Sequence, residues 1–276
     1  MNNSANFPVI ISNGASQMSH KWYSNALKIP ESDIKLCSDE LARATRGFCS
    51  THSKIGSSNR RIIRSTLYAC MEQKKLNPDQ KIIVVLELSF DLRKELWVER
   101  ETLPDGAEGN FRSVQLAHNT DWWTKSRNQP RIDKEDLISI EGETLNSIER
   151  RHLTRWQQGE MFFYSPYAET INTLADLIML AGFMKQHGID YLIYRSCPIE
   201  KFTSAHLLDT FRDSVDTDPG MLDLFNFSFT GWCIEQGYTP IDSLDRPELG
   251  HPSLEAHQAF GKLLTQKLKE AYPQWA

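Results

Sequence analysis

Short apolar runs alternate with helix-like segments at the start of the chain. Residues 8–11 (PVII) are apolar, and after a polar turn Met18, Trp22, Ala26 and Leu27 recur at helical spacing. Short apolar runs are typical of strands buried on both faces, whereas a spacing of three to four residues is typical of an amphipathic helix. The pattern predicts a strand, a turn and a helix.

The same alternation continues as far as residue 89. Ser57 or Ser58 can cap a helix that ends before the breaker at residues 77–79;. The inward face of this helix is predicted to comprise Ile62, Ile63, Thr66, Leu67 and Cys70. Residues 81–89 (KIIVVLELS) give the strongest strand signal of the chain, which predicts a central strand of a parallel sheet;.

The alternation resumes after Tyr167. Residues 169–186 have apolar positions at helical spacing, Gly188 follows as a C-cap, and residues 189–194 (IDYLIY) predict a strand;. Ser253 can cap a last helix;. Alternating strands and helices predict an α/β fold, a three-layer α/β/α sandwich with a mainly parallel central sheet, in which ligands bind at the carboxyl ends of the strands.

Residues 97–165 interrupt this alternation. They are polar and rich in turns, but they also contain several large aromatic side chains. We expect a single domain over residues 1–276 in which residues 97–165 form an inserted subdomain or lid. The aromatic residues are candidates for a sugar-stacking surface or for the core of the insertion, and the second interpretation is favoured because a small subdomain needs large apolar side chains.

Charge and cysteine content narrow the classes of protein and partner. The formal net charge is −5 with lysines and arginines interleaved among acids, so a nucleic-acid partner is not expected;. The five cysteines never form a C-x-x-C pair, which predicts free thiols and no metal site;. The first residues resemble no signal peptide, and the longest apolar stretch, residues 174–184, has the length of a core helix;. These features predict a cytoplasmic protein without a membrane partner.

Three polar segments should meet at the carboxyl edge of the sheet. The first is Gly14-Ala15-Ser16, where the serine is a candidate nucleophile or simply a helix cap;. The second is residues 55–59 (IGSSN), where the glycine follows a predicted strand and its N–H is a candidate oxyanion donor;. The third is residues 248–253 (ELGHPS), where His251 can act as a base and Glu248 can orient it;. Asp245 in the same loop is a second candidate acid.

The order of these segments resembles the GDSL/SGNH hydrolase superfamily, in particular the divergent SGNH-like proteins often encoded by bacteriophages. The resemblance covers residues 8–96 and 167–270, and it rests on NGAS, GSSN, the strand end followed by S-x-x-x-R-x-E, and GHPS. It implies a flavodoxin-like SGNH fold, no cofactor, and a viral protein located in the cytoplasm of a host cell. Its implied site residues are Ser16 as nucleophile, Gly56 as second oxyanion donor, His251 as base and Arg93 as a substrate-binding residue.

The chain departs from the family pattern in the first and third blocks, and Glu248 takes the place of the family's usual aspartate. Gly14-Ala15-Ser16 replaces G-D-S, and the strand end Glu87-Leu88-Ser89 replaces G-x-N-D, so the usual oxyanion asparagine is missing. Ser89 or Asn59 is the candidate replacement for it. Loss of one oxyanion donor typically costs about 10²–10³ in turnover.

The sequence therefore predicts a serine esterase or deacylase that acts on a small-molecule or carbohydrate ester. Two alternatives stay open: an O-acyltransferase of the same fold, and a non-catalytic binding or virion-associated module with a degenerate site. A weaker alternative is a nucleotide-sugar transferase with a metal held by residues 213–218 (DSVDTD);. A solvated loop is the simpler interpretation of that acidic run.

Overall fold

The computed structural model describes most of the chain outside the predicted insertion. The described residues are 7–54, 57–89, 166–197, 206–244, 247 and 250–276, with backbone alone for 93–97, 111–115, 166–167 and 206–209. The predicted insertion at 97–165 lies outside the described residues except for Trp97 and residues 111–115.

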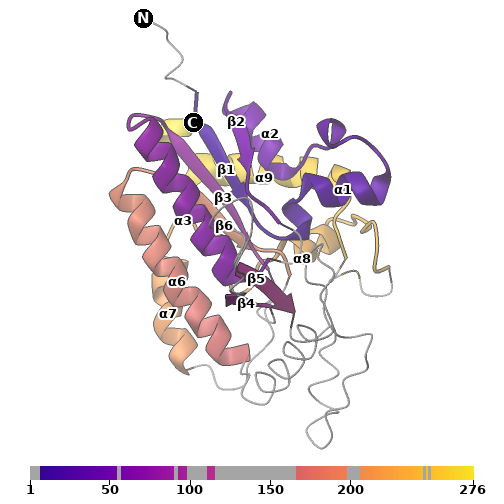
Figure 1. The fold of residues 1–276 in the computed structure, drawn as a ribbon. Helices are drawn as coiled ribbons and strands as arrows, with labels where there is room; N and C mark the ends of the chain where they lie inside the picture. Colours follow the sequence, from indigo (N-terminus) through magenta and orange to yellow (C-terminus); the bar gives the residue numbers. More distant parts are fainter. Residues whose placement is uncertain are drawn as a thin grey trace, which may run out of the picture.

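The centre of the molecule is a four-stranded sheet in which all strands are parallel (Figure 1). The strands are β1 (Val9–Asn13), β2 (Phe48–Thr51), β3 (Ile82–Leu88) and β6 (Asp190–Arg195), in the order β2-β1-β3-β6. Met221 extends the sheet beyond β6 through a parallel bridge to Ile193. The central position predicted for residues 81–89 is confirmed.

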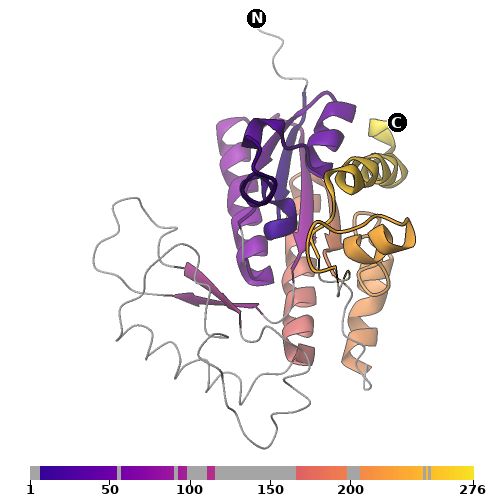
Figure 2. The same cartoon turned by 90° about the vertical axis from the view of Figure 1, so that its right-hand side faces the viewer.

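Helices cover both faces of this sheet. One face packs against α3 (Asn59–Leu76) and α6 (Pro166–Gln186), with α7 (His206–Asp216) beside α6. The other face packs against α2 (Cys37–Ala44), α8 (Phe229–Glu235) and α9 (Leu254–Ala271). Figure 2 shows the layers from the side, with α3 and α9 on opposite sides of the strands. The molecule is a three-layer α/β/α sandwich, as the sequence predicts.

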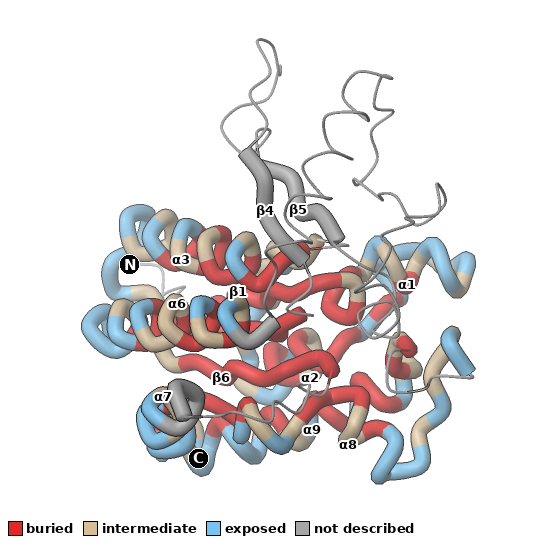
Figure 3. Tube along the Cα trace, turned by 90° about the horizontal axis from the view of Figure 1, so that it is seen from below, coloured by how far each residue is buried: buried red, intermediate tan, exposed pale blue. Residues whose placement is uncertain are grey.

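Strands β1, β3 and β6 are buried because successive side chains enter two different cores, whereas the edge strand β2 is partly exposed. In β1, Val9 and Ile11 pack toward α3 and α6, whereas Ile10 packs toward α2 and α9. The same alternation holds in β3, where Ile83 and Val85 face α9. Both faces of β1 and β3 therefore need apolar side chains, which explains their continuous β-branched runs. Figure 3 shows this buried layer running through the sheet.

The remaining elements complete the frame around the sheet. Helix α1 (His20–Leu27) follows a short 3-10 helix, η2 (Ser16–Met18), and two further 3-10 helices, η3 and η6, span Glu31–Asp33 and Pro273–Trp275. Strands β4 (Arg93–Trp97) and β5 (Phe111–Gln115) form an antiparallel pair. Helix α2 lies in a stretch for which the sequence pattern predicted no regular element, and β2 is the strand expected before residues 55–59. Among the described helices, none is long and apolar enough to cross a membrane.

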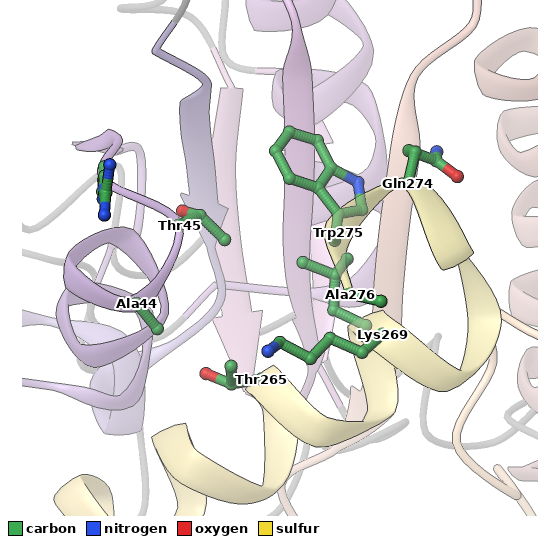
Figure 4. A pocket seen from close by; sticks show the side chains of 9 residues that line it. Ala44, Thr45, Thr265, Lys269, Gln274, Trp275 and Ala276 are labelled. Carbon is green, nitrogen blue, oxygen red and sulfur yellow. The ribbon is translucent and has the colours of Figure 1, made fainter.

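A pocket of about 280 Å³ lies at the amino ends of the strands (Figure 4). Its wall is formed by the end of α2, the second half of α9 and η6. Trp275 places the pocket at this end, because its indole N–H donates a hydrogen bond to Asp190, the first residue of β6. The pocket is therefore separate from the edge where the candidate chemistry lies.

Candidate active site

The turn after β1 is held rigidly by Asn13. Its amide nitrogen donates hydrogen bonds to the carbonyl oxygen of Ile62 and to the hydroxyls of Ser65 and Thr66 on α3. Its amide oxygen accepts a hydrogen bond from the backbone N–H of Gly14. All of these groups are buried, so the direction in which the chain leaves the sheet is fixed by α3.

Gly14 is required by a close approach rather than by its backbone angles. A Cβ atom there would lie 2.9 Å from Cβ of Glu87 and 2.9 Å from Cγ of Met18. Both distances are shorter than carbon atoms tolerate. The glycine therefore allows the turn to pass directly over β3 and to bring Ser16 to the carboxyl edge.

Ser16 begins η2 and does not cap α1. The cap of α1 is Ser19, whose hydroxyl accepts a hydrogen bond from the N–H of Trp22. In the described part of the chain, the N–H groups of Ser16 and Gln17 donate to no other backbone group. Such N–H groups at the start of a helical turn can stabilise negative charge that develops on a bound carbonyl oxygen.

The structure brings Ser16 and His251 together from positions 235 residues apart. Nε2 of His251 lies 2.8 Å from Oγ of Ser16, and Nδ1 lies 2.9 Å from Oδ2 of Asp242. The other oxygen of Asp242 accepts a hydrogen bond of 2.7 Å from the backbone N–H of His251. A carboxylate at Nδ1 favours the tautomer with the proton on Nδ1, which leaves Nε2 able to accept the Ser16 proton.

The acid in this arrangement is a residue that the sequence pattern did not select. Glu248 and Asp245, the two predicted acids, lie outside the described residues. The structure places Asp242, nine residues before His251, at the ring nitrogen instead. The sequence pattern favoured Glu248, because the family places its acid three residues before the histidine. The only sequence signal for Asp242 is its membership of the same polar loop.

The loop that carries His251 is held on both sides of the histidine. The side-chain amide of Gln17 donates to the carbonyl oxygen of Gly250 at 3.3 Å. The hydroxyl of Tyr23 donates to the carbonyl oxygen of Pro252 at 2.8 Å. The segment that carries the nucleophile therefore also positions the backbone of the base.

An aromatic stack lies against the base, and a hydrogen bond between two buried side chains lies behind it. The indole of Trp22 stacks on the His251 imidazole, with ring centroids 3.4 Å apart and an angle of 14° between the planes. Behind it, Nε2 of His257 on α9 lies 2.7 Å from the Tyr23 hydroxyl. His257 is fully buried, and burial lowers its pKa to about 3 because desolvation disfavours the charged ring;. His257 is therefore neutral at ordinary pH.

The second segment and the region after β3 are only partly described. Gly56 lies outside the described residues, and only the backbone of Arg93 is described. Asn59 is the first residue of α3, and its side-chain oxygen accepts a hydrogen bond of 2.7 Å from the N–H of Ser89. The two candidate replacements for the missing asparagine thus contact each other at the end of β3.

The acidic run at 213–218 is divided between surface and core. Asp218 is buried, where it accepts hydrogen bonds from the Tyr191 hydroxyl and the Gly220 N–H and pairs with Lys185. Asp213 and Asp216 are exposed on α7. Among the described residues, no group of three His, Cys, Asp or Glu side chains is arranged to hold a metal ion. None of the five cysteines, all of them described, forms a disulfide.

No protein-family model matches the chain, and a search of curated proteins found no match.

Proposed function

We propose that the chain is an SGNH-like serine hydrolase that cleaves carboxylic esters, with an acylated carbohydrate as the expected substrate class. The observation that carries the proposal is the continuous hydrogen-bonded series from Ser16 through His251 to Asp242. This is the arrangement that activates a serine hydroxyl for attack on a carbonyl carbon.

The reaction would proceed in two halves. In the first, His251 takes the Ser16 proton as Oγ attacks the ester carbonyl, the backbone N–H of Ser16 stabilises the oxyanion, and protonated His251 returns the proton to the departing alcohol. In the second, His251 removes a proton from water, which attacks the acyl-enzyme and releases the acid. Asp242 stabilises the imidazolium in both halves.

The test of this proposal is covalent labelling by a fluorophosphonate probe. We expect one label at Ser16, located by peptide mass spectrometry, and none in Ser16→Ala or His251→Ala. Ser19→Ala is the matched control, because Ser19 lies three residues away and its hydroxyl caps α1. This control should keep the label. A folded wild-type protein that takes up no label would refute the hydrolase and leave the non-catalytic module.

Hydrolysis and transfer share the acyl-enzyme and differ in what attacks it. An aryl acetate can be supplied with and without a sugar acceptor, and the products can be separated by mass spectrometry. Free acetate as the main product in both reactions supports the hydrolase. Acetylated sugar as the main product would identify the O-acyltransferase instead.

A further inference from the structure

The hydrogen bonds of His251 to Ser16 and Asp242 restrain one motion of its ring only weakly. The bonds to Ser16 and Asp242 both lie at ring nitrogens and fix the direction of the ring. They restrain rotation about the line between those nitrogens only weakly, because hydrogen bonds tolerate a broad range of angles. A flat group against the ring face would remove this freedom.

Trp22 supplies such a group. Its indole lies nearly parallel to the imidazole at 3.4 Å between centroids. The indole is itself anchored, because it packs edge-on against the buried ring of Tyr23 and against the small core of Tyr23, Ile34 and Leu36. The backbone N–H of Trp22 donates a hydrogen bond to the Ser19 hydroxyl, which caps α1. The stacking surface is therefore part of the fold.

The indole also suits the charge that the ring acquires during the reaction. A protonated imidazole over an indole face is stabilised by the negative face of the aromatic ring. A neutral imidazole gains much less from the same contact. The stack therefore favours the form of His251 that the transition state requires.

We propose that Trp22 is a positioning residue that fixes the plane of the His251 ring and stabilises its protonated form. The catalytic consequence rests on the proposed hydrolase function, whereas the effect on the histidine itself does not. Gln17 and Tyr23 hold the neighbouring carbonyl oxygens, so the backbone of His251 stays in place when the indole is removed.

Other groups that face His251 also influence its titration. Asp242 lies at Nδ1 and Ser16 at Nε2, while the Tyr23 ring lies edge-on at 6.4 Å. His257 on α9 also interacts electrostatically with His251, but its low pKa keeps it neutral in the range of interest. A change limited to Trp22 replaces none of these groups.

The test is a histidine NMR titration of the full chain that follows the nitrogen shifts of His251. In Trp22→Leu, which keeps an apolar cover, we expect the pKa of His251 to fall by about half a pH unit. Trp22→Phe should restore part of this change. Trp232→Leu is the matched control, because Trp232 packs in the core beside Phe229 and Phe260 on α8 and α9. It should lower stability without moving the His251 titration.

Kinetics provide the second measurement. Trp22→Leu should lower kcat on an aryl acetate about two- to fivefold with little change in KM. An unchanged His251 titration with an unchanged kcat would overturn the role of Trp22. A shifted titration in a protein that takes up no fluorophosphonate would keep the inference about Trp22 and refute the hydrolase. The experiments therefore distinguish a failure of the inference about Trp22 from a failure of the proposed hydrolase function.

Discussion

At the scale of single residues, Asp242 makes two contacts with the same histidine. Oδ2 accepts from the ring at Nδ1, and Oδ1 accepts from the backbone N–H of His251. One carboxylate thereby fixes both the tautomer and the position of the base. The Asp242 side chain is 42% exposed, so its bond to the imidazole is partly screened by water;. Its role is orientation more than overall stability.

Asp242→Asn should lower kcat/KM by up to about 10⁴, because an amide at this position favours the wrong tautomer of His251. Asp245→Asn and Glu248→Gln are the matched controls, and both should stay near wild type. Steady-state hydrolysis of an aryl acetate and the rate of fluorophosphonate labelling both measure the effect. A large loss in Glu248→Gln with an active Asp242→Asn would reassign the acid to Glu248.

At the scale of elements, the turn between β1 and η2 determines where the nucleophile lies. Asn13 ties this turn to α3, and Gly14 lets it pass against Glu87 and Met18. Gly182 has no such role. No described atom lies within 4 Å of a Cβ placed at Gly182, in the exposed face of α6.

Gly14→Ala should lower the free energy of unfolding by about 1–3 kcal/mol, because the added methyl group overpacks a buried turn. Gly182→Ala should raise it by up to about 1 kcal/mol, because alanine favours a helix interior more than glycine does. Urea unfolding of both variants measures the difference. Equal changes in the two variants would show that the turn after β1 relaxes freely around a side chain.

At the scale of the whole molecule, a buried network connects the site to the core behind it. Tyr23 on α1 contacts the loop of the base through Pro252 and contacts α9 through His257. The Tyr23 hydroxyl donates to Pro252, so His257 must donate its Nε2 proton to Tyr23. This contact requires a neutral or protonated ring with a proton at Nε2, and burial selects the neutral form.

The pKa of His257 predicts how stability changes with pH. An unfolded histidine has a pKa near 6.5, whereas folded His257 has a pKa of about 3;. Between these values the unfolded chain binds a proton that the folded chain does not, so stability falls as the pH is lowered below about 6.5. At pH 5 this effect amounts to roughly 2 kcal/mol.

His257→Gln should remove this part of the pH dependence, because glutamine can donate to Tyr23 but does not titrate. Urea unfolding of both proteins between pH 7 and pH 5 measures the difference in slope. In Asp39, burial acts to raise the pKa, but hydrogen bonds from His20 and Leu36 outweigh it and leave the pKa below its usual value. The stability that depends on ionised Asp39 is therefore lost only at a pH below the range of this measurement. Parallel curves of unfolding free energy against pH for wild type and His257→Gln would contradict the low pKa of His257.

Local sequence patterns were sufficient to predict the central strands and most of the helices around them. The runs at 8–11 and 81–89 predict β1 and β3 because a strand covered on both faces needs apolar side chains at every position;. Gly188 ends the predicted helix with the positive φ of 59° that a C-cap requires;. Strand β2 was expected before residues 55–59 but without bounds, because a partly exposed edge strand of four residues has no clear apolar pattern. Helix α2 was missed.

The sequence by itself determined the layers, the parallel sheet and the edge at which Ser16 and His251 would lie. Only the tertiary structure decided that Ser19 caps α1, that Asp242 orients the base and that Trp22 covers its ring. Strand and helix patterns reflect burial, which repeats at short spacing along the chain. The partners of His251 depend on how loops far apart in sequence meet at the sheet edge, and no local periodicity encodes that.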